Sequence, residues 1–317
     1  MNIKLLSKAA TLENLSHLIK GGFILPILRF KAKDYENKKD IIIKKILDEF
    51  NSNLIVRSSS SNEDNYETSN AGGFQSVLDV DITSEEIINN AIECVINSYG
   101  SSLTDKDEFF LQPMLKNVSM SGVVFSSDLD SLSPYFIINY DESGSTSSVT
   151  SGTSNELKTF ISFSDNYDIP NKYLQKVISV TRECQKIFSN NFLDIEFAFS
   201  DNQLYILQVR PIVKKKKEDL SSIDLKTSLK KLHKKIEKLN ASHPNLLGDK
   251  TIFGVMPDWN PAEIIGIRPK RLALSLYKEL ITDDTWAYQR DNYGYRNLRS
   301  HPLLVSFLGI PYIDTRI

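Results

Sequence analysis

The chain has 317 residues, of which 41% are apolar and 25% charged, and its formal net charge is −2. This length permits one large domain or two to three ordinary ones, and the nearly neutral charge gives no reason to expect nucleic acid or an anionic membrane as a partner. The two cysteines are expected to be small buried apolar residues, no apolar run approaches the roughly 20 residues of a membrane span, and the N-terminus lacks the apolar core of a signal peptide, so we expect a soluble cytoplasmic protein.

Helix and strand patterns alternate through the first two thirds of the chain. Apolar residues with helical spacing predict helices at 40–50, 85–99 and 173–188. The second helix follows Thr83 and Glu86, whose spacing predicts a capping box, and is closed by Gly100. Short runs of branched and aromatic residues predict strands at 53–58, 76–82, 108–115, 121–128 and 134–140.

Two further segments in this part of the chain are rich in turn residues. Residues 141–154 have the sequence DESGSTSSVTSGTS, a composition that favours a disordered loop, with a mobile ligand-binding loop as the alternative. Residues 192–212 have the sequence FLDIEFAFSDNQLYILQVRPI. This pattern predicts a β-hairpin that turns at Asp201–Asn202 and ends at Pro211.

Composition changes twice after this hairpin. From Lys214 the chain is basic and helical with a narrow apolar stripe, and its lysines favour a solvated helix face over an anion site. After Gly248 come prolines, a tryptophan and an expected helix at 270–290, and the sequence ends at LGIPYIDTRI without a helix cap or polar tail. We therefore expect a first domain at 1–213, a helical linker at 214–250, and the start of a truncated second domain at 251–317.

Four separated segments carry side chains suited to phosphate or metal ions. In chain order they contain Lys8, Arg57 followed by four serines, Asp194 with Glu196, and Gln208 with Arg210. Because residues two apart on a strand share a face, the predicted hairpin would bring two acids, an amide and a guanidinium to one site. Carboxylates suit Mg²⁺ and arginine suits phosphate. Together they meet the electrostatic need of phosphoryl transfer.

Each of these segments alone also has an ordinary structural interpretation. Lys8 fits a surface lysine, and Arg57 fits a salt bridge at the end of a strand. The serines Ser58–Ser61 fit a loop. Asp194 and Glu196 fit the polar outer face of a hairpin. Only the joint occurrence of the four segments favours a phosphate site.

The order of these motifs resembles the ATP-grasp domain of the phosphoenolpyruvate synthase and pyruvate phosphate dikinase family. The resemblance covers residues 8–212 and rests on SKAATLENL, VRSSSSNED with SNAGGFQSVLDV, LQPMLKNVSMSGVVFSSD and DIEFAFSDNQLYILQVRPI. It implies an α+β ATP-grasp fold, with two lobes and the nucleotide between them, followed by the linker and the second domain. It also implies an ATP-dependent phosphotransferase of the dikinase type, with ATP and Mg²⁺ as cofactors.

The resemblance implies roles for residues that match the motifs. Three basic residues match phosphate-binding positions, namely Lys8, Arg57 and Arg210. Of these, Arg57 and Arg210 are expected to be catalytic. Glu196 and Gln208 match the positions that hold Mg²⁺ and the phosphates, and Asp194 matches an acid beside them.

Two loops of the family also have counterparts in this chain. The turn that covers the phosphates matches Ala71, Gly72 and Gly73, where absent side chains permit close backbone approach. The segment that lines the adenine pocket matches Gln112, Met114 and Leu115. Where the family has a Gly-Leu-Gly-Glu turn, this chain has DESGSTSSVTSG, so only Glu142 could stand for that glutamate.

Family members pass phosphate through a histidine in a Thr-Ser-His motif on a separate domain. None of the four histidines here has that context, so we expect the chain to carry the ATP half of the reaction and to need the phosphohistidine domain of a longer protein. The segment from Gly254 to Arg296 and the closing PYIDTRI resemble a divergent branch of the family found in surface-polysaccharide gene sets. That resemblance implies a small-molecule acceptor, with L-glutamine favoured.

Other interpretations remain open at this point. The acceptor could be pyruvate or an antibiotic such as rifampin, and the domain could be a nucleotide-binding module without catalysis. Asp258, Trp259, Asn260 and Glu263 could line the acceptor site, but Asn-Pro-Ala-Glu is also a good helix start, and we favour the helix.

Overall fold

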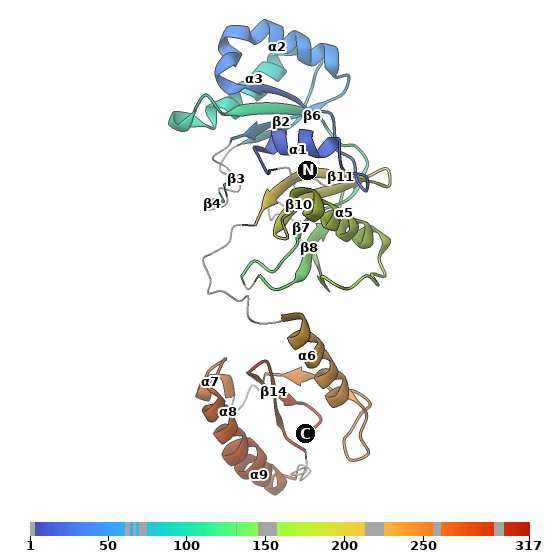
Figure 1. Cartoon of the computed structure of the whole chain (residues 1–317), viewed down its shortest axis with the longest axis vertical. Helices are drawn as coiled ribbons and strands as arrows, with labels where there is room; N and C mark the ends of the chain where they lie inside the picture. The colour runs from blue at the N-terminus through green and yellow to red at the C-terminus, as the bar shows by residue number, and fades with distance from the viewer. Residues whose placement is uncertain are drawn as a thin grey trace. The chain divides into compact units, whose positions relative to one another are not determined.

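The computed structural model describes residues 4–60, 64–65, 68–69, 75–130, 132–144, 157–212, 225–255, 261–294 and 301–317. The chain divides into two compact units, Met1–Leu220 and Ser221–Ile317. The first unit contains two large antiparallel sheets and the second contains a smaller one (Figure 1).

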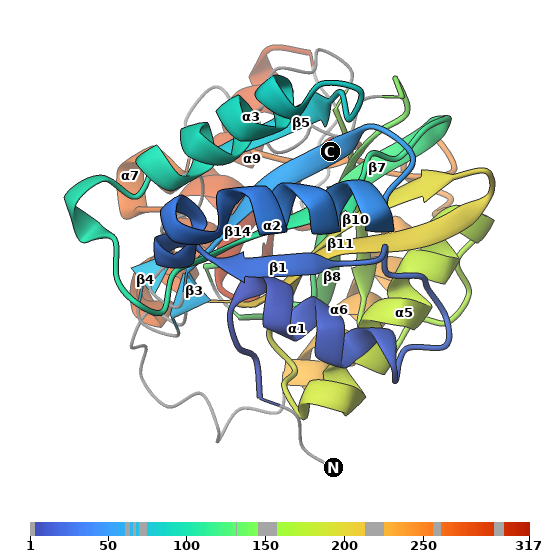
Figure 2. The same cartoon turned by 90° about the horizontal axis from the view of Figure 1, so that it is seen from above.

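Four of the described strands form the first sheet, in the order β1-β6-β2-β5 and with every pair antiparallel. They are β1 (Leu28–Lys31), β2 (Leu54–Ser59), β5 (Ser76–Val80) and β6 (Glu108–Pro113). The helices α2 (Tyr35–Glu49) and α3 (Glu85–Asn97) cover one face of this sheet (Figure 2) and share a core with Leu54 and Val56. Because side chains alternate along a strand, Ile55 and Arg57 of β2 lie on the opposite face.

Five of the described strands form the second sheet, in the order β11-β10-β7-β8-β9 and also antiparallel throughout. They are β7 (Val118–Phe125), β8 (Tyr135–Asp141), β9 (Lys158–Phe163), β10 (Leu193–Ser200) and β11 (Gln203–Pro211). The helices α1 (Lys8–Ser16) and α5 (Lys172–Phe188) pack against this sheet, because Leu12 and Leu15 of α1 and the apolar side of α5 belong to its core.

Four short elements complete the described part of the first unit. They are the ribbon of β3 (Asp64–Asn65) and β4 (Thr68–Ser69), and the 3₁₀ turns η1 (Ala32–Asp34) and η2 (Gly100–Ser102). The start of α3 corrects one prediction. Its N-cap is Ser84, whose hydroxyl accepts a hydrogen bond from the Ile87 N–H, so the capping box predicted from Thr83 and Glu86 is wrong by one residue.

The second unit combines a three-stranded sheet with helices. The sheet has the order β12-β14-β13, and its strands are β12 (Phe253–Gly254), β13 (Leu304–Phe307) and β14 (Ile310–Asp314). The basic helix α6 (Leu225–Asn240) is tied to this sheet by Arg316, which donates to the carbonyls of Leu239 at 2.5 Å and Ala241 at 2.9 Å. Asp314 holds the Arg316 guanidinium at 2.8 Å.

The helical part of the second unit differs from its prediction. The sequence predicts one helix at 270–290, whereas the structure has α8 (Arg271–Tyr277), the π-helical segment η4 (Lys278–Thr285) and α9 (Trp286–Asn292). The short helix α7 (Pro261–Ile265) begins at the proline where a helix start is predicted. In the part of the chain that the structure describes, no helix has both the length and the apolar character needed to cross a membrane.

The α+β architecture with two sheet-based lobes is confirmed. The predicted strands at 53–58, 76–82, 108–115, 121–128 and 134–140 all occur, with ends shifted by a few residues. Cys184 is buried, and its burial raises the pKa of the thiol to about 12. Cys94 is exposed on α3, so the prediction that both cysteines are buried is wrong for Cys94.

Candidate functional site

The hairpin of β10 and β11 turns where the sequence predicts, and a register shift next to Glu196 pairs the four predicted residues. Asp194 lies opposite Arg210, and Glu196 lies opposite Gln208. The chain reverses at Asp201 and Asn202, which have φ values of 50° and 64°, the left-handed conformations that a tight hairpin turn requires. Two acids, an amide and a guanidinium therefore share one face of the second sheet.

A β-bulge at Leu207 sets which side chains reach this face. The register shifts between Glu196 and Phe197, so that Phe197 pairs with Ile206 and Leu207 is the extra residue. Ile206 and Val209 both belong to the core of the second sheet, although strict alternation would put residues three apart on opposite faces. The extra residue thus turns Gln208 away from the core.

Arg57 reaches this hairpin from the other sheet. Its Nη1 donates to the Leu207 carbonyl at 2.8 Å, and its Nη2 donates to Oε1 of Gln208 at 3.0 Å. The guanidinium also lies 5.6 Å from the centre of the Phe110 ring, within the range of a cation–π contact. The carbonyl of the bulge residue and one side-chain amide therefore fix the arginine between the two sheets.

Two arginines and two carboxylates form ion pairs at this site. Nη2 of Arg57 lies 3.5 Å from Glu196 Oε2, while Nη2 of Arg210 lies 3.1 Å from Asp194 Oδ2 and 3.5 Å from Glu196 Oε1. The four side chains are between 12% and 16% exposed. Charges this poorly hydrated need partners, and two arginines with two carboxylates give the cluster a formal charge of zero.

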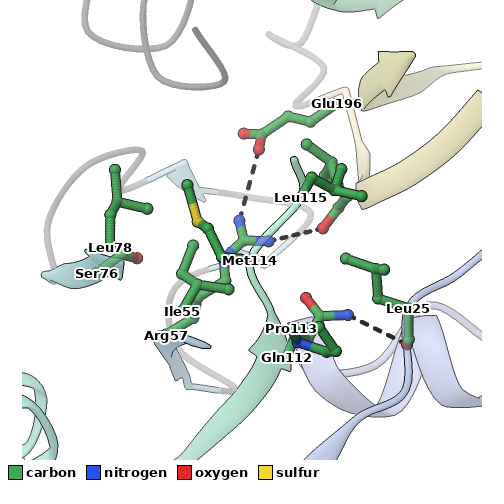
Figure 3. A pocket seen from close by; sticks show the side chains of 11 residues that line it. Leu25, Ile55, Arg57, Ser76, Leu78, Gln112, Pro113, Met114, Leu115 and Glu196 are labelled. Carbon is green, nitrogen blue, oxygen red and sulfur yellow. Dashed lines mark hydrogen bonds and ion pairs between the residues drawn. The ribbon is translucent and has the colours of Figure 1, made fainter. Parts of the chain in front are cut away.

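An open pocket of about 260 Å³ lies beside this cluster. Five of the predicted site residues line it: Arg57, Gln112, Met114, Leu115 and Glu196. Figure 3 shows Arg57 extending toward Glu196 and Gln112 turned toward Leu25. Most of the remaining lining is apolar, from Leu25, Ile55, Leu78, Pro113 and Leu207, so the pocket joins an apolar wall to a charged corner.

The backbone of the predicted adenine segment is held in place at two points. Nε2 of Gln112 donates to the Leu25 carbonyl at 3.4 Å, and the Met114 N–H donates to the Asn53 carbonyl at 2.8 Å. Gln112 is almost fully buried. These bonds position the end of β6 along the pocket.

Lys8 does not line the pocket. It is the first residue of α1, which packs against β11 and β2. The next residue, Ala9, donates its N–H to the Ser59 hydroxyl at 3.1 Å. The start of α1 is thus anchored to the end of the strand that carries Arg57.

In the side-chain amide of Gln208, the oxygen is hydrogen-bonded and the nitrogen is a buried donor. Its Oε1 accepts from Arg57, and a guanidinium can only donate. Its Nε2 is buried, and no hydrogen-bond partner for it occurs among the described residues. In this arrangement the amide offers a donor, which suits a phosphate oxygen. The second lone pair of Oε1 stays available for Mg²⁺, the other role predicted for Gln208.

The acids of the cluster fit a magnesium ion that arrives with a phosphate ligand. Asp194 and Glu196 supply carboxylate oxygens on one face, and Mg²⁺ usually takes one or two carboxylates and completes its shell with phosphate and water. No group of three or more His, Cys, Asp or Glu suited to a metal occurs in the described ranges. The donor set therefore fits Mg²⁺ bound together with a polyphosphate.

The remaining predicted residues are partly described by the structure. Ala71, Gly72 and Gly73 lie outside the described residues. Glu142 is exposed at the end of β8 and pairs with Lys158. Asp258, Trp259 and Asn260 also lie outside the described residues, while Glu263 lies in α7. His243 is exposed, and its ring lies 4.5 Å from that of His301.

Among the contributors that sequence reasoning missed, three lie around Arg57. Leu207 supplies a backbone carbonyl, Ile55 lines the apolar wall, and Phe110 faces the guanidinium of Arg57. Only Ile55 carried a usable signal, because it lies two residues from Arg57 on the same strand face. The other two depend on how the two sheets meet.

A scan of protein-family models found no match, and a search of curated proteins also found none. Solved structures similar to part of the chain include several ligases. They include the D-Ala:D-Ser ligase VanG from Enterococcus faecalis (13% identity, TM-score 0.37, covering 65% of this chain and 52% of that one) and the D-alanine-D-alanine ligases from Helicobacter pylori (14%, 0.38, 70% and 59%) and Coxiella burnetii (11%, 0.36, 64% and 46%). The chain thus spans about half the length of these proteins, and at such scores the likeness carries no argument about function.

Proposed function

We propose that the first unit is an ATP-grasp domain that binds Mg·ATP between its two sheets, as the nucleotide-binding part of an ATP-dependent phosphotransferase. One observation carries this proposal: Arg57 of the first sheet meets Glu196 and Gln208 of the second sheet at the charged corner of an apolar pocket. An apolar wall suits a nucleobase, and paired guanidiniums suit its phosphates.

The residues of the cluster would divide the work. Arg57 and Arg210 would bind phosphate oxygens, with Gln208 donating from Nε2 and Lys8 adding charge from the start of α1. Glu196 and Asp194 would hold the magnesium ion. When bound, Mg²⁺ neutralises charge that develops on a transferring phosphoryl group. The backbone at Gln112, Met114 and Leu115 would border the base.

The particular enzyme that we propose is the L-glutamine kinase of capsular phosphoramidate biosynthesis, a cytoplasmic protein that would not bind nucleic acid or a membrane. It converts ATP, L-glutamine and water to AMP, phosphate and L-glutamine phosphate through a phosphohistidine. The support is the resemblance of the segment after Gly254 to that branch, and the absence of a Thr-Ser-His motif around the four histidines. The histidine domain would then belong to the rest of a longer protein.

The nucleotide site is tested by calorimetry with Mg·ATP. The Arg210→Ala variant should bind Mg·ATP more weakly by roughly 1.5–3 kcal/mol, because a charged hydrogen bond to phosphate is lost. Arg268→Ala, which removes an exposed arginine of the second unit, is the control and should bind like the parent. No measurable binding by the parent chain would overturn the proposed function, and equal binding by all three proteins would remove Arg210 from the site.

The acceptor is tested separately on a full-length enzyme. AMP and phosphate release would be followed with L-glutamine, pyruvate and rifampin in turn. Release only with L-glutamine supports the glutamine kinase. Release with another acceptor would replace it, and nucleotide binding without any turnover would favour a module without catalysis.

A further inference from the structure

Glu196 lies between two guanidiniums. One of its carboxylate oxygens is 3.5 Å from Nη2 of Arg57, and the other is 3.5 Å from Nη2 of Arg210. The two arginines come from different sheets, since Arg57 is in β2 and Arg210 is in β11. One acid therefore contacts both groups that are proposed to bind phosphate.

Arg57 does not depend on this acid for its position. Its two shorter contacts, at 2.8 and 3.0 Å, are with the Leu207 carbonyl and with Gln208, which are neutral. The 3.5 Å separation from Glu196 exceeds the roughly 2.7–2.9 Å of a strong charge-assisted hydrogen bond. The carboxylate could therefore leave while the guanidinium stays in place.

The two carboxylates neutralise the two arginines, so a phosphate ligand can bind well only if Glu196 moves away from them. With Asp194 and Glu196 ionised, the two arginines are neutralised, and a polyphosphate that enters alone faces carboxylates that are only about 15% exposed. Displaced carboxylates beside phosphate would repel it, and burial increases that cost. A divalent cation would remove this repulsion, because it binds the carboxylates while the guanidiniums bind the phosphates.

We propose that Glu196 makes this site selective for metal-bound over metal-free polyphosphate, by occupying Arg57 and Arg210 until a divalent cation takes its carboxylate. This inference rests on the proposed nucleotide site. It assigns Glu196 a second role besides holding the metal: the same side chain raises the affinity for Mg·ATP and lowers the affinity for free ATP.

The two roles are separated by titrating ATP into the chain by calorimetry, once with Mg²⁺ and once with EDTA at equal ionic strength. In the parent chain, Mg²⁺ should raise the affinity for ATP roughly 5- to 150-fold, the usual range of coupling between two ligands. Glu196→Gln should bind metal-free ATP about tenfold more tightly than the parent and should respond far less to Mg²⁺. Glu93→Gln removes the same charge from the exposed side of α3 and should behave like the parent.

A second variant distinguishes the position of Glu196 from its charge alone. Asp194→Asn also removes one negative charge, but Glu196 contacts the guanidiniums of both Arg57 and Arg210, whereas Asp194 lies opposite Arg210 in the hairpin. Asp194→Asn should therefore strengthen metal-free binding less than Glu196→Gln. Equal gains in both variants would overturn the specific role of Glu196, as would a Glu196→Gln variant that is correctly folded by thermal unfolding and gains nothing without metal. Absence of ATP binding by the parent in both buffers would instead overturn the nucleotide site itself.

Discussion

At the scale of single residues, the segment around Arg57 joins the two sheets and carries the side chain that we propose to bind phosphate. The two interpretations of Arg57, a salt bridge and a phosphate site, describe the same side chain, since it pairs with Glu196 where a phosphate would lie. Three of the serines after it, Ser58, Ser59 and Ser60, are buried, and Ser59 receives the Ala9 N–H. Ser58 and Ser59, which also fit a loop in the sequence, thus form the buried end of β2.

Gln208 should be a residue whose replacement harms binding more than folding. Its Nε2 is a buried donor for which the described residues offer no partner, and removing such a group recovers a desolvation cost of roughly 1–3 kcal/mol. The Gln208→Leu variant removes this cost but also takes an acceptor from Nη2 of Arg57, so the two effects oppose each other and the variant should unfold at a temperature close to that of the parent. It should bind Mg·ATP about tenfold more weakly, because the Nε2 donor proposed for a phosphate oxygen is lost.

Gln112→Leu gives the matched comparison for stability. Gln112 is as buried as Gln208, but its Nε2 donates to the Leu25 carbonyl. Its replacement should lower the unfolding temperature because that carbonyl loses a bond. If Gln208→Leu proved the less stable of the two variants, the amide of Gln208 would be a structural group.

At the scale of elements, the site could be predicted as far as local patterns reach. The hairpin from Leu193 to Pro211 was predictable because alternating residues and the Asp201–Asn202 turn specify it locally. The bulge at Leu207 was not, because nothing in the residue itself marks the extra position, and packing decides which side chains are buried. The π-helical segment Lys278–Thr285 was missed because the periodicity of its apolar residues differs little from that of an α-helix.

The start of α3 allows the corrected cap to be tested. Ser84→Ala should lower the free energy of unfolding by about 1 kcal/mol, because the Ile87 N–H loses its acceptor. The measurement is urea unfolding followed by circular dichroism. Thr83→Ala is the comparison and should cost less, since Thr83 does not cap the helix. A larger loss in Thr83→Ala would restore the capping box predicted from the sequence.

At the scale of the whole molecule, the sequence predicted the class of fold better than the arrangement of the site. The two α+β lobes are what the family resemblance implies, and each of the two large sheets has its own apolar core. The meeting of Arg57 with Leu207 joins residues 150 positions apart, which no local pattern specifies. The strands β13 and β14 were missed because both are short and their turn contains a single glycine, Gly309.

The division into two units predicts that a ligand acts on only one of them. All residues of the pocket and the charged cluster belong to Met1–Leu220. In differential scanning calorimetry we expect two transitions. Mg·ATP at about 100 times its dissociation constant should stabilise one of them by roughly 2.7 kcal/mol and leave the other unchanged.

Asp314→Asn identifies the other transition. This acid holds Arg316 at the end of α6 within the second unit. Its replacement should therefore lower the temperature of only the transition that Mg·ATP does not shift. A single transition that shifts as a whole with ligand would show that the two units unfold together and would contradict this prediction.

The bulge at Leu207 also constrains how this sequence could change over time. Inserting or deleting one residue between Leu204 and Val209 would keep the composition of β11 but reverse the parity of everything after it. Gln208 and Arg210 would then turn toward the core and Val209 toward the charged face. Substitutions in this strand alter one contact at a time, whereas a single-codon length change would dismantle the whole charged cluster, so β11 should tolerate changes of residue far better than changes of length.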